Sequence, residues 1–109
     1  MKTAEALLCV RFNSNYSLEE LNEICLADLE NLRSVPGLVQ KYYVAEEYSG
    51  AISSIYMFES KTTRAAFSAS DLAKGIPSRY DMIPDTIRVE YYDTLIVLHE
   101  DESPGKFNG

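Results

Sequence analysis

The sequence is poor in the residues that usually bind metals or form disulfide frameworks. Its 109 residues include no Trp, one His and two Cys, and no C-x-x-C pair is present. Two cysteines cannot build a disulfide scaffold, and a single histidine cannot supply a typical zinc or iron site. We therefore expect no bound metal and a reducing, cytoplasmic environment.

Positive charge is also scarce. Ten Lys and Arg stand against seventeen Asp and Glu, which gives a net charge of −7. Proteins that bind nucleic acids or anionic membranes need an excess of positive charge, so we expect neither partner. No stretch of the chain approaches the roughly 18 apolar residues that cross a bilayer.

The chain does contain enough apolar residues for one folded domain. Hydrophobic residues make up 46% and charged residues 25%, an ordinary globular balance. We predict one domain over residues 1–98 and a polar, solvated tail over 99–109 that begins at His99, the only histidine.

Hydrophobic periodicity predicts strands and helices in the order βαββαβ. The strands are expected over 4–13, 38–45, 51–58 and 86–98, the helices over 18–33 and 61–73, and a loop or one short turn over 76–85. Ser17 and Glu20 form a capping box, and Ser60 caps the second helix. The expected buried stripe of the first helix consists of Leu18, Leu21, Cys25, Leu29 and Leu32.

This order is typical of a ferredoxin-like α+β protomer, in which both helices lie on one face of an antiparallel sheet. Large residues occupy both faces of several strands, and the chain has eight Tyr. Leu8, Val10 and Phe12 should share one face of the first strand. We therefore expect a second copy to cover the open face and form a homodimeric α+β barrel.

Several stretches carry a family resemblance: PGLVQKYYVAEE, GAISSIYMFES and IRVEYYDTLIVL. From about Leu7 to Leu98 the chain resembles the YdhR-type monooxygenases of the dimeric α+β-barrel superfamily, which are related to antibiotic-biosynthesis monooxygenases. The resemblance implies a homodimer and oxidation of an aromatic or quinol-type molecule by dioxygen, without a metal or flavin cofactor. Related sequences carry Trp where this chain has Gln40 and Tyr43, and often His where Asp71 is nearest.

Such chemistry requires a general base, hydrogen-bond donors and an apolar slot. The candidate catalytic residues are Tyr56, Lys41 and Glu90. The candidate substrate-binding residues are Arg11, Asn13, Tyr43, Tyr92 and Asp71. All of these except Asp71 are expected to converge on one cavity. Alternatively, Arg11, Lys41 and Glu90 form a buried ion-pair network at the dimer interface.

Three interpretations of function stay open at this point. The first is a small cofactor-independent monooxygenase, the second a non-catalytic dimer that binds a small hydrophobic ligand, and the third a lyase or isomerase of the same superfamily. Tyr80 is expected on a surface loop, and Cys9 and Cys25 are expected to be core residues.

Overall fold

Four strands form one antiparallel sheet in the computed structural model, which describes residues 3–98 and the backbone of residues 105–106. The strands are β1 (Ala6–Phe12), β2 (Leu38–Ala45), β3 (Ile52–Phe58) and β4 (Arg88–Asp93), in the order β2-β3-β1-β4. Every neighbouring pair is antiparallel. The order is that of a ferredoxin-like α+β protomer, so the predicted fold class is confirmed.

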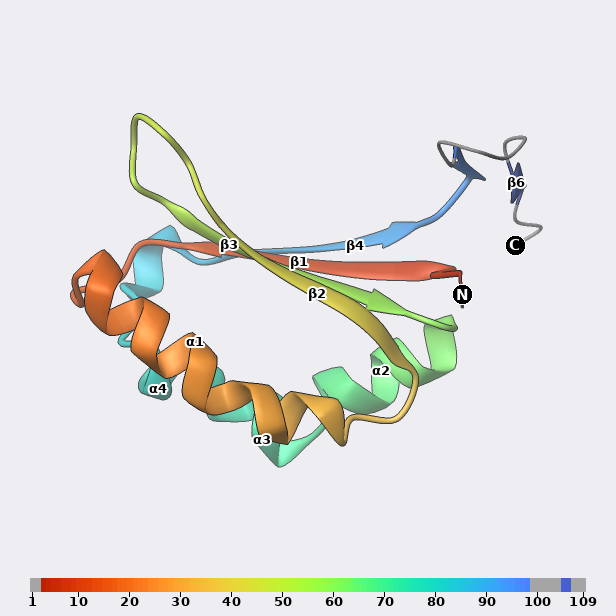
Figure 1. Cartoon of the computed structure of the whole chain (residues 1–109), viewed down its shortest axis with the longest axis horizontal. Coiled ribbons are helices and arrows are strands. Elements are labelled where there is room, and N and C mark those ends of the chain that lie inside the picture. The colour runs from red at the N-terminus through yellow and green to blue at the C-terminus, as the bar shows by residue number, and fades with distance from the viewer. Residues whose placement is uncertain (1–2, 99–104, 107–109) are drawn as a thin grey trace.

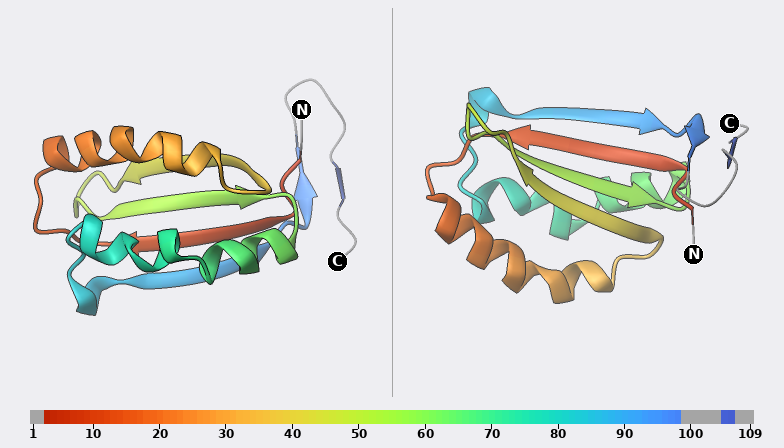
Figure 2. Two further views of the ribbon diagram at one scale, coloured as in Figure 1. Left: turned by 90° about the horizontal axis from the view of Figure 1, so that it is seen from below. Right: turned by 45° about the horizontal axis from the view of Figure 1, so that its top comes forward.

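The helices cover one face of the sheet, and within the described residues the other face has no covering layer (Figure 1, Figure 2). They are α1 (Leu18–Arg33), α2 (Lys61–Ser68), α3 (Asp71–Lys74) and α4 (Ile76–Arg79), followed by the 3-10 turn η1 (Pro84–Thr86). The predicted capping box at Ser17 and the predicted N-cap at Ser60 are both present, and Thr63 completes a capping box with Ser60. The hairpin between β2 and β3 projects on the uncovered side (Figure 1).

The single helix predicted over 61–73 is wrong in its second half. α2 ends at Ser68, and α3 begins after its N-cap, Ser70. The Ser70 hydroxyl donates to the carbonyl of Phe67 at 2.6 Å and accepts from the N–H of Ala73 at 3.2 Å. Serine side chains compete with the backbone for hydrogen bonds, so Ser70 ends one helix and starts the next.

The segment 76–85 contains more structure than the predicted loop or single turn. It forms α4 and η1, and each has proline in its first turn, where the missing N–H costs nothing. The segment is fastened to the end of β1, because the N–H of Ile83 donates to the carbonyl of Asn13 at 2.8 Å and Ser14 bridges to Met82. This attachment carries Tyr80 into the interior.

The last predicted strand, over 86–98, is too long. β4 ends at Asp93, opposite Ala6, the first residue of β1, and one further backbone hydrogen bond follows, from the N–H of Thr94 to the carbonyl of Glu5 at 2.8 Å. The Arg64 guanidinium closes this end of the sheet by donating to the carbonyls of Leu7 at 3.0 Å and Tyr92 at 2.8 Å. A separate pair of short strands follows, β5 (Ile96–Val97) and β6 (Gly105–Lys106).

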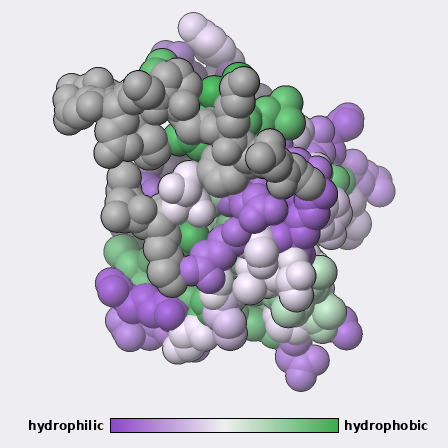
Figure 3. Space-filling view, turned by 90° about the vertical axis from the view of Figure 1, so that its right-hand side faces the viewer, coloured by the Kyte–Doolittle hydropathy of each residue, from purple (hydrophilic) through white to green (hydrophobic). Residues whose placement is uncertain are grey.

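The segment directly after β4 contains several exposed apolar residues. Leu95, Ile96 and Leu98 are exposed. Figure 3 views the molecule from this end and shows hydrophobic atoms between hydrophilic ones. Within the predicted polar tail only β6 is described, and His99 lies outside the described residues.

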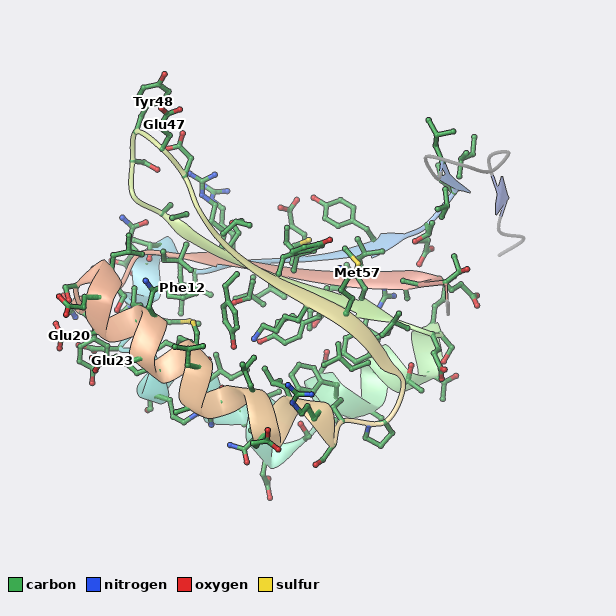
Figure 4. All side chains as sticks on the ribbon, in the orientation of Figure 1. Phe12, Glu20, Glu23, Glu47, Tyr48 and Met57 are labelled. Carbon is green, nitrogen blue, oxygen red and sulfur yellow. The ribbon has the colours of Figure 1, made fainter. Side chains whose placement is uncertain are left out.

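The core lies between the sheet and the helices. Leu8 and Phe12 are buried and Val10 is half-buried, so the predicted inner face of β1 is confirmed. Figure 4 shows Phe12 on the helix side of the sheet and Met57 on the opposite side. The largest fully buried side chains are Phe12, Tyr56, Phe58 and Tyr80.

The buried stripe of α1 differs from the prediction at Leu18, Leu29 and Asp28. Leu21 and Leu32 are buried as expected, but Leu18 and Leu29 are 55% and 38% exposed. Asp28 is buried instead, with 4% of its surface exposed. Positions 21, 25, 28 and 32 follow the 3.6-residue period as well as the leucines do, so the helix turns a carboxylate toward the sheet.

Candidate functional site

The strand register brings two rows of side chains together on the helix-facing side of the sheet. Lys41 lies opposite Tyr56 in the β2–β3 pair, and Tyr43 lies opposite Ser54. On the other side of β3, Tyr56 pairs with Leu8 of β1. Because side chains alternate across a strand, Lys41, Tyr43 and Tyr56 all point toward α1 and the helices that follow.

These side chains form a continuous hydrogen-bonded chain. The Nζ of Lys41 donates to the hydroxyls of Tyr43 at 2.5 Å and Tyr56 at 3.0 Å. The hydroxyls of Tyr43 and Tyr80 are 2.8 Å apart, and Tyr80 donates to Oδ2 of Asp28 at 2.8 Å. The chain therefore runs from Tyr56 on the central strand β3 to Asp28 on α1.

Aromatic rings surround the ammonium group of this chain. The Nζ of Lys41 lies 3.8 Å from the ring centroid of Tyr43 and 4.1 Å from that of Tyr56. A cation in this position is attracted by the negative faces of the rings. Tyr43 and Tyr80 also stack, with centroids 6.3 Å apart.

Burial makes the amine of Lys41 titratable near neutral pH. The pKa of Lys41 is lowered to about 7, mainly by removal from water and to a lesser extent by the nearby Arg79, against opposing effects of Cys25 and Asp28. Burial also raises the pKa of Tyr43, Tyr56 and Tyr80. Near neutral pH the tyrosines therefore stay protonated, while Lys41 populates both its charged and its neutral form.

Asp28, at the opposite end of the hydrogen-bonded chain, is itself charged. Burial, the largest single influence, raises the pKa of Asp28, but hydrogen bonds from Tyr80, Asn31 and Arg79 together outweigh it and leave that pKa below its ordinary value. The Nη2 of Arg79 lies 3.2 Å from Oδ2 of Asp28, and Asn31 donates to Oδ1 at 3.2 Å. The carboxylate is thus ionised and fully hydrogen-bonded.

A cavity of about 170 Å³ adjoins Tyr56 on the side of β1 and β4. Its lining is mainly apolar and includes Leu8, Val10, Phe67, Ile76, Val89 and Tyr91. Val89 and Tyr91 are 48% and 56% exposed, so the cavity opens to solvent along β4. Its size is close to that of an engineered cavity of about 150 Å³ that takes up benzene.

One polar atom in the cavity lining has no partner. The Oγ of Ser68 is buried and makes no hydrogen bond within the part of the chain that the structure describes. Buried hydroxyls are normally paired, because an unpaired one costs about 1–3 kcal/mol. Ser68, Tyr56 and Tyr91 are the lining residues that carry a hydroxyl, and that of Ser68 lies beneath the cavity surface.

The structure separates the predicted site residues into two groups. Lys41, Tyr43 and Tyr56 come together on the helix side. Arg11, Glu90 and Tyr92 lie on the opposite, uncovered face, because their rows in the sheet are those of Ser53, Ile55 and Met57. The expected single cavity is therefore wrong, and so is the ion-pair network of Arg11, Lys41 and Glu90, since a sheet lies between Lys41 and the other two residues.

The two remaining predicted residues stay outside the network. Asn13 is exposed just beyond β1, and its backbone N–H donates to the hydroxyl of Thr86 at 2.9 Å. Asp71 is exposed in the first turn of α3. Neither lines the cavity beside Tyr56.

Sequence reasoning missed Asp28 and Arg79 and misplaced Tyr80. Tyr80 was expected on the surface, but 1% of it is exposed. The helical spacing of Asp28 from Leu21 and Leu32 was an available signal for its burial. No local pattern pointed to Tyr80, because its burial depends on the attachment of 76–85 to β1.

The described residues form neither a metal-binding cluster nor a membrane-spanning helix. Residues 3–98 contain no group of three His, Cys, Asp or Glu side chains placed to hold a metal ion. No helix in the described part of the chain is both long enough and apolar enough to cross a membrane.

Comparison with known proteins shows likeness in structure only. No protein-family model and no curated protein sequence matches the chain. A monooxygenase from Streptomyces coelicolor, solved in complex with the ligand nanaomycin D, matches with a TM-score of 0.67 at 15% identity, over 90% of this chain and 94% of its own. SnoaB, a cofactor-independent oxygenase from Streptomyces nogalater, matches with a TM-score of 0.64 at 12% identity, over 92% and 100%.

The same fold also occurs in a protein without an assigned activity. A protein of unknown function from Nitrosomonas europaea matches with a TM-score of 0.66 at 11% identity, over 94% of this chain and 100% of its own. At such identities the likeness establishes the fold that this chain shares with antibiotic biosynthesis monooxygenases. The closer resemblance to YdhR-type proteins stays a prediction.

Proposed function

We propose that the protein is a small monooxygenase that oxidises a phenolic or quinol-type aromatic molecule in the cavity beside Tyr56, without a metal or flavin. The observation that carries this proposal is the position of Lys41. Its amine has a pKa of about 7 and contacts the hydroxyl of Tyr56, which lines an apolar cavity. A titratable amine, a hydrogen-bond donor and an apolar slot are what activation of a phenol requires.

The first step in this proposal is loss of the substrate's phenolic proton. The neutral amine of Lys41 accepts a proton through the hydroxyl of Tyr56, which in turn takes the proton of the phenol. Lys41 is then an ammonium that donates to Tyr56, as the structure shows it, and Tyr56 donates to the phenolate. The developing negative charge is stabilised by these donors in a site of low polarity.

The phenolate then supplies all the electrons for the reaction with dioxygen. Oxidation of a phenol with a free ring carbon gives a quinone and water: one oxygen atom enters the ring, and the other leaves as water with the two hydrogen atoms that the substrate loses. The equation balances without an added reductant. The protein's part is to bind the ring, remove the proton and stabilise the anion.

Two details of the cavity favour a small substrate. A volume of about 170 Å³ accommodates one aromatic ring, with room for further atoms along the open side at β4. Ser68 lies in the cavity wall, and a rotation of its side chain would bring its unpartnered hydroxyl to a second oxygen of the ligand. A dihydroxylated ring, such as a hydroquinone, suits both features.

Homodimerisation through the uncovered face of the sheet is part of this proposal. Tyr42 and Tyr92 are 47% and 46% exposed on that face, beside the half-buried Ile55 and Met57. An apolar surface of this kind on a sheet is usually covered. A second copy of the chain would complete the α+β barrel expected from the sequence.

Oxygen uptake with a panel of substituted hydroquinones and phenols tests the proposed activity. We expect uptake by the wild type and a loss of about 10²-fold or more in Tyr56→Phe and Lys41→Met. The control is Tyr48→Phe, because Tyr48 lies at the tip of the β2–β3 hairpin, far from the cavity (Figure 4).

The other outcomes separate the alternatives. Binding of the ring without oxygen uptake or any product would indicate a non-catalytic ligand-binding protein. Product formation without oxygen uptake would indicate a lyase or isomerase that only moves protons. Full activity in both variants would show that Tyr56 and Lys41 are not the site.

A further inference from the structure

In the hydrogen-bonded chain from Asp28 to Tyr56, each contact has one donor and one acceptor. Asp28 determines which partner donates, and we call this the direction of the chain. An ionised carboxylate can only accept hydrogen bonds. Asp28 is 4% exposed and receives hydrogen bonds from Tyr80, Arg79 and Asn31. The single proton of the Tyr80 hydroxyl is thereby committed to Asp28.

The donor of each following hydrogen bond is determined by the hydrogen bond before it. Because the proton of Tyr80 points to Asp28, the 2.8 Å contact between the Tyr43 and Tyr80 hydroxyls must use the proton of Tyr43. The oxygen of Tyr43 is then an acceptor for Lys41, which lies 2.5 Å away. Each hydroxyl has one proton, so no member of the chain can be reversed without breaking the bond to Asp28.

At the other end the same rule makes the hydroxyl oxygen of Tyr56 an acceptor and directs its proton away from Lys41. Lys41 donates to Tyr43 and also to Tyr56. The oxygen of Tyr56 therefore accepts from Lys41, so the Tyr56 proton is not used in the bond to Lys41; Ser54 is the other side-chain hydrogen-bond partner of this hydroxyl. Tyr56 is also part of the cavity lining.

We infer that Asp28 and Tyr80 are positioning residues: by fixing the direction of the hydrogen-bond chain they hold the protonated amine of Lys41 as a donor to Tyr56 and direct the hydroxyl proton of Tyr56 away from Lys41, where an anionic oxygen of a ligand in the cavity can accept it. The part that concerns the ligand rests on the proposed function. The part that concerns Lys41 does not, because it follows from the buried chain alone.

Lys41 is surrounded by charged and titratable groups from every element that packs against it. These are Cys25 and Asp28 of α1, Tyr43 of β2, Tyr56 of β3, Arg79 of α4, and Tyr80, which caps α4. Arg79 and Asp28 form an ion pair at 3.2 Å. Removal of the Asp28 charge would leave Arg79 to repel the ammonium of Lys41.

The pKa of Lys41 provides a test that needs no ligand. It can be followed by NMR in protein labelled with ¹³C-lysine, where Lys41 is expected to titrate near 7 and apart from the exposed lysines. In Tyr80→Phe no charge changes, but the hydroxyl of Tyr43 becomes free to donate to the neutral amine. We expect the Lys41 pKa to fall by about 0.5 to 1 unit in Tyr80→Phe and in Asp28→Asn.

Matched controls separate this effect from altered packing. Tyr48→Phe and Asp85→Asn make the same chemical changes at exposed positions and should leave the pKa of Lys41 unchanged. Tyr80→Phe keeps the ring in the core and removes one oxygen, so it is the variant expected to fold best. An unchanged Lys41 pKa in folded Tyr80→Phe would overturn the inference.

A phenol that titrates near neutral pH tests the second part. We expect the wild type to lower the pKa of bound 4-nitrophenol by about one unit, because Tyr56 donates to the phenolate. Tyr80→Phe should lose at least half of this shift and still bind nitrobenzene, which has no hydroxyl, as well as the wild type does. Equal phenolate preference in both proteins would refute the role assigned to Tyr56.

Failure of the proposed function gives a different result. If neither 4-nitrophenol nor nitrobenzene binds the wild type, the cavity is not a site for aromatic ligands. A fall of the Lys41 pKa in Tyr80→Phe would still support the direction of the chain.

Discussion

The two faces of the sheet carry similar residue types and behave differently. The helix-facing side holds Lys41, Tyr43 and Tyr56, and the open side holds Arg11, Glu90 and Tyr92. On the helix side burial lowers the pKa of Lys41 to about 7 and links it to a buried carboxylate. On the open side Arg11, Glu90 and Tyr92 are exposed to water. The difference shows that desolvation, more than residue type, produces chemically useful side chains.

The largest expected difference between the faces concerns packing. Phe58 and Met57 are neighbours on β3 that point to opposite sides, and Phe58 is 0% exposed. Phe58→Ala should lower the free energy of unfolding by about 3–5 kcal/mol, because it opens a cavity in the core. Met57→Ala should cost less than about 1.5 kcal/mol in the single chain.

Urea denaturation of both variants measures this contrast. A Met57→Ala effect that increases with protein concentration would indicate that a second copy covers the open face. Equal costs for the two variants at low concentration would contradict the assignment of the core to one side.

Loss of the buried carboxylate should have the next largest effect. Asp28→Asn leaves Arg79 without its partner and should cost about 1–2 kcal/mol at pH 7. The folded-state pKa of Asp28 is lowered, so its contribution is present above the unfolded value of 3.8 and is lost as the pH falls through the folded value.

Unfolding measured from pH 2 to 7 checks this expectation. The difference between the wild type and Asp28→Asn should shrink below about pH 3.8. Asp85→Asn, at an exposed position, should show no such difference. A gap that stays constant down to pH 2 would contradict the lowered pKa.

The titration of Lys41 should give an effect of a different kind, a change of stability with pH on the alkaline side. Between its folded pKa of about 7 and its unfolded value of 10.5, the unfolded chain binds more protons than the folded one. Stability should therefore rise with pH over this range, by at most about 1.4 kcal/mol per pH unit from this group.

Lys41→Met should remove this slope between pH 7 and 9.5, and Lys74→Met, at an exposed position, should keep it. Unfolding free energies from urea titrations at several pH values provide the measurement. A slope that persists in Lys41→Met would assign the titration to another group.

The smallest effect on the protomer is expected from a charge on the open face. Ile55→Arg should change the stability of the single chain by less than about 1 kcal/mol but prevent the proposed dimer from forming. Glu23→Arg is the control, because Glu23 points away from the sheet on α1 (Figure 4).

Native mass spectrometry distinguishes the outcomes. We expect a dimer for the wild type and Glu23→Arg, and a monomer for Ile55→Arg. A dimer that survives Ile55→Arg would place the interface elsewhere, and a monomeric wild type would leave the open face in water.

Much of the fold could be predicted because its signals are local. The capping box at Ser17, the N-cap at Ser60, the alternation along β1 and the turn at Gly50 each depend on a few neighbouring residues. The predictions are wrong where contacts outside the local sequence pattern determine where a helix or strand ends. Ser70 divides a helix through competing hydrogen bonds, and β4 ends opposite the first residue of β1.

The candidate site was predictable only in part for the same reason. Alternation along a strand shows that Lys41 and Tyr43 share a face, but it does not tell which face of a neighbouring strand that is. The register of β3 against β1 and β2 places Tyr56 with Lys41, and the register of β4 against β1 places Glu90 on the other side. Two residue groups that the sequence could not distinguish are thereby separated by the sheet.

The sequence by itself determined the element order, the helix starts, the inner face of β1 and the apolar content that makes one core. The tertiary structure alone decided that Asp28, Lys41, Tyr43, Tyr56 and Tyr80 meet. These residues come from segments distant in the chain, and their contact requires the strand register, the rotation of α1 and the attachment of residues 76–85 to β1. The physical reason is that side-chain chemistry depends on burial and partners, and both are properties of the packed chain.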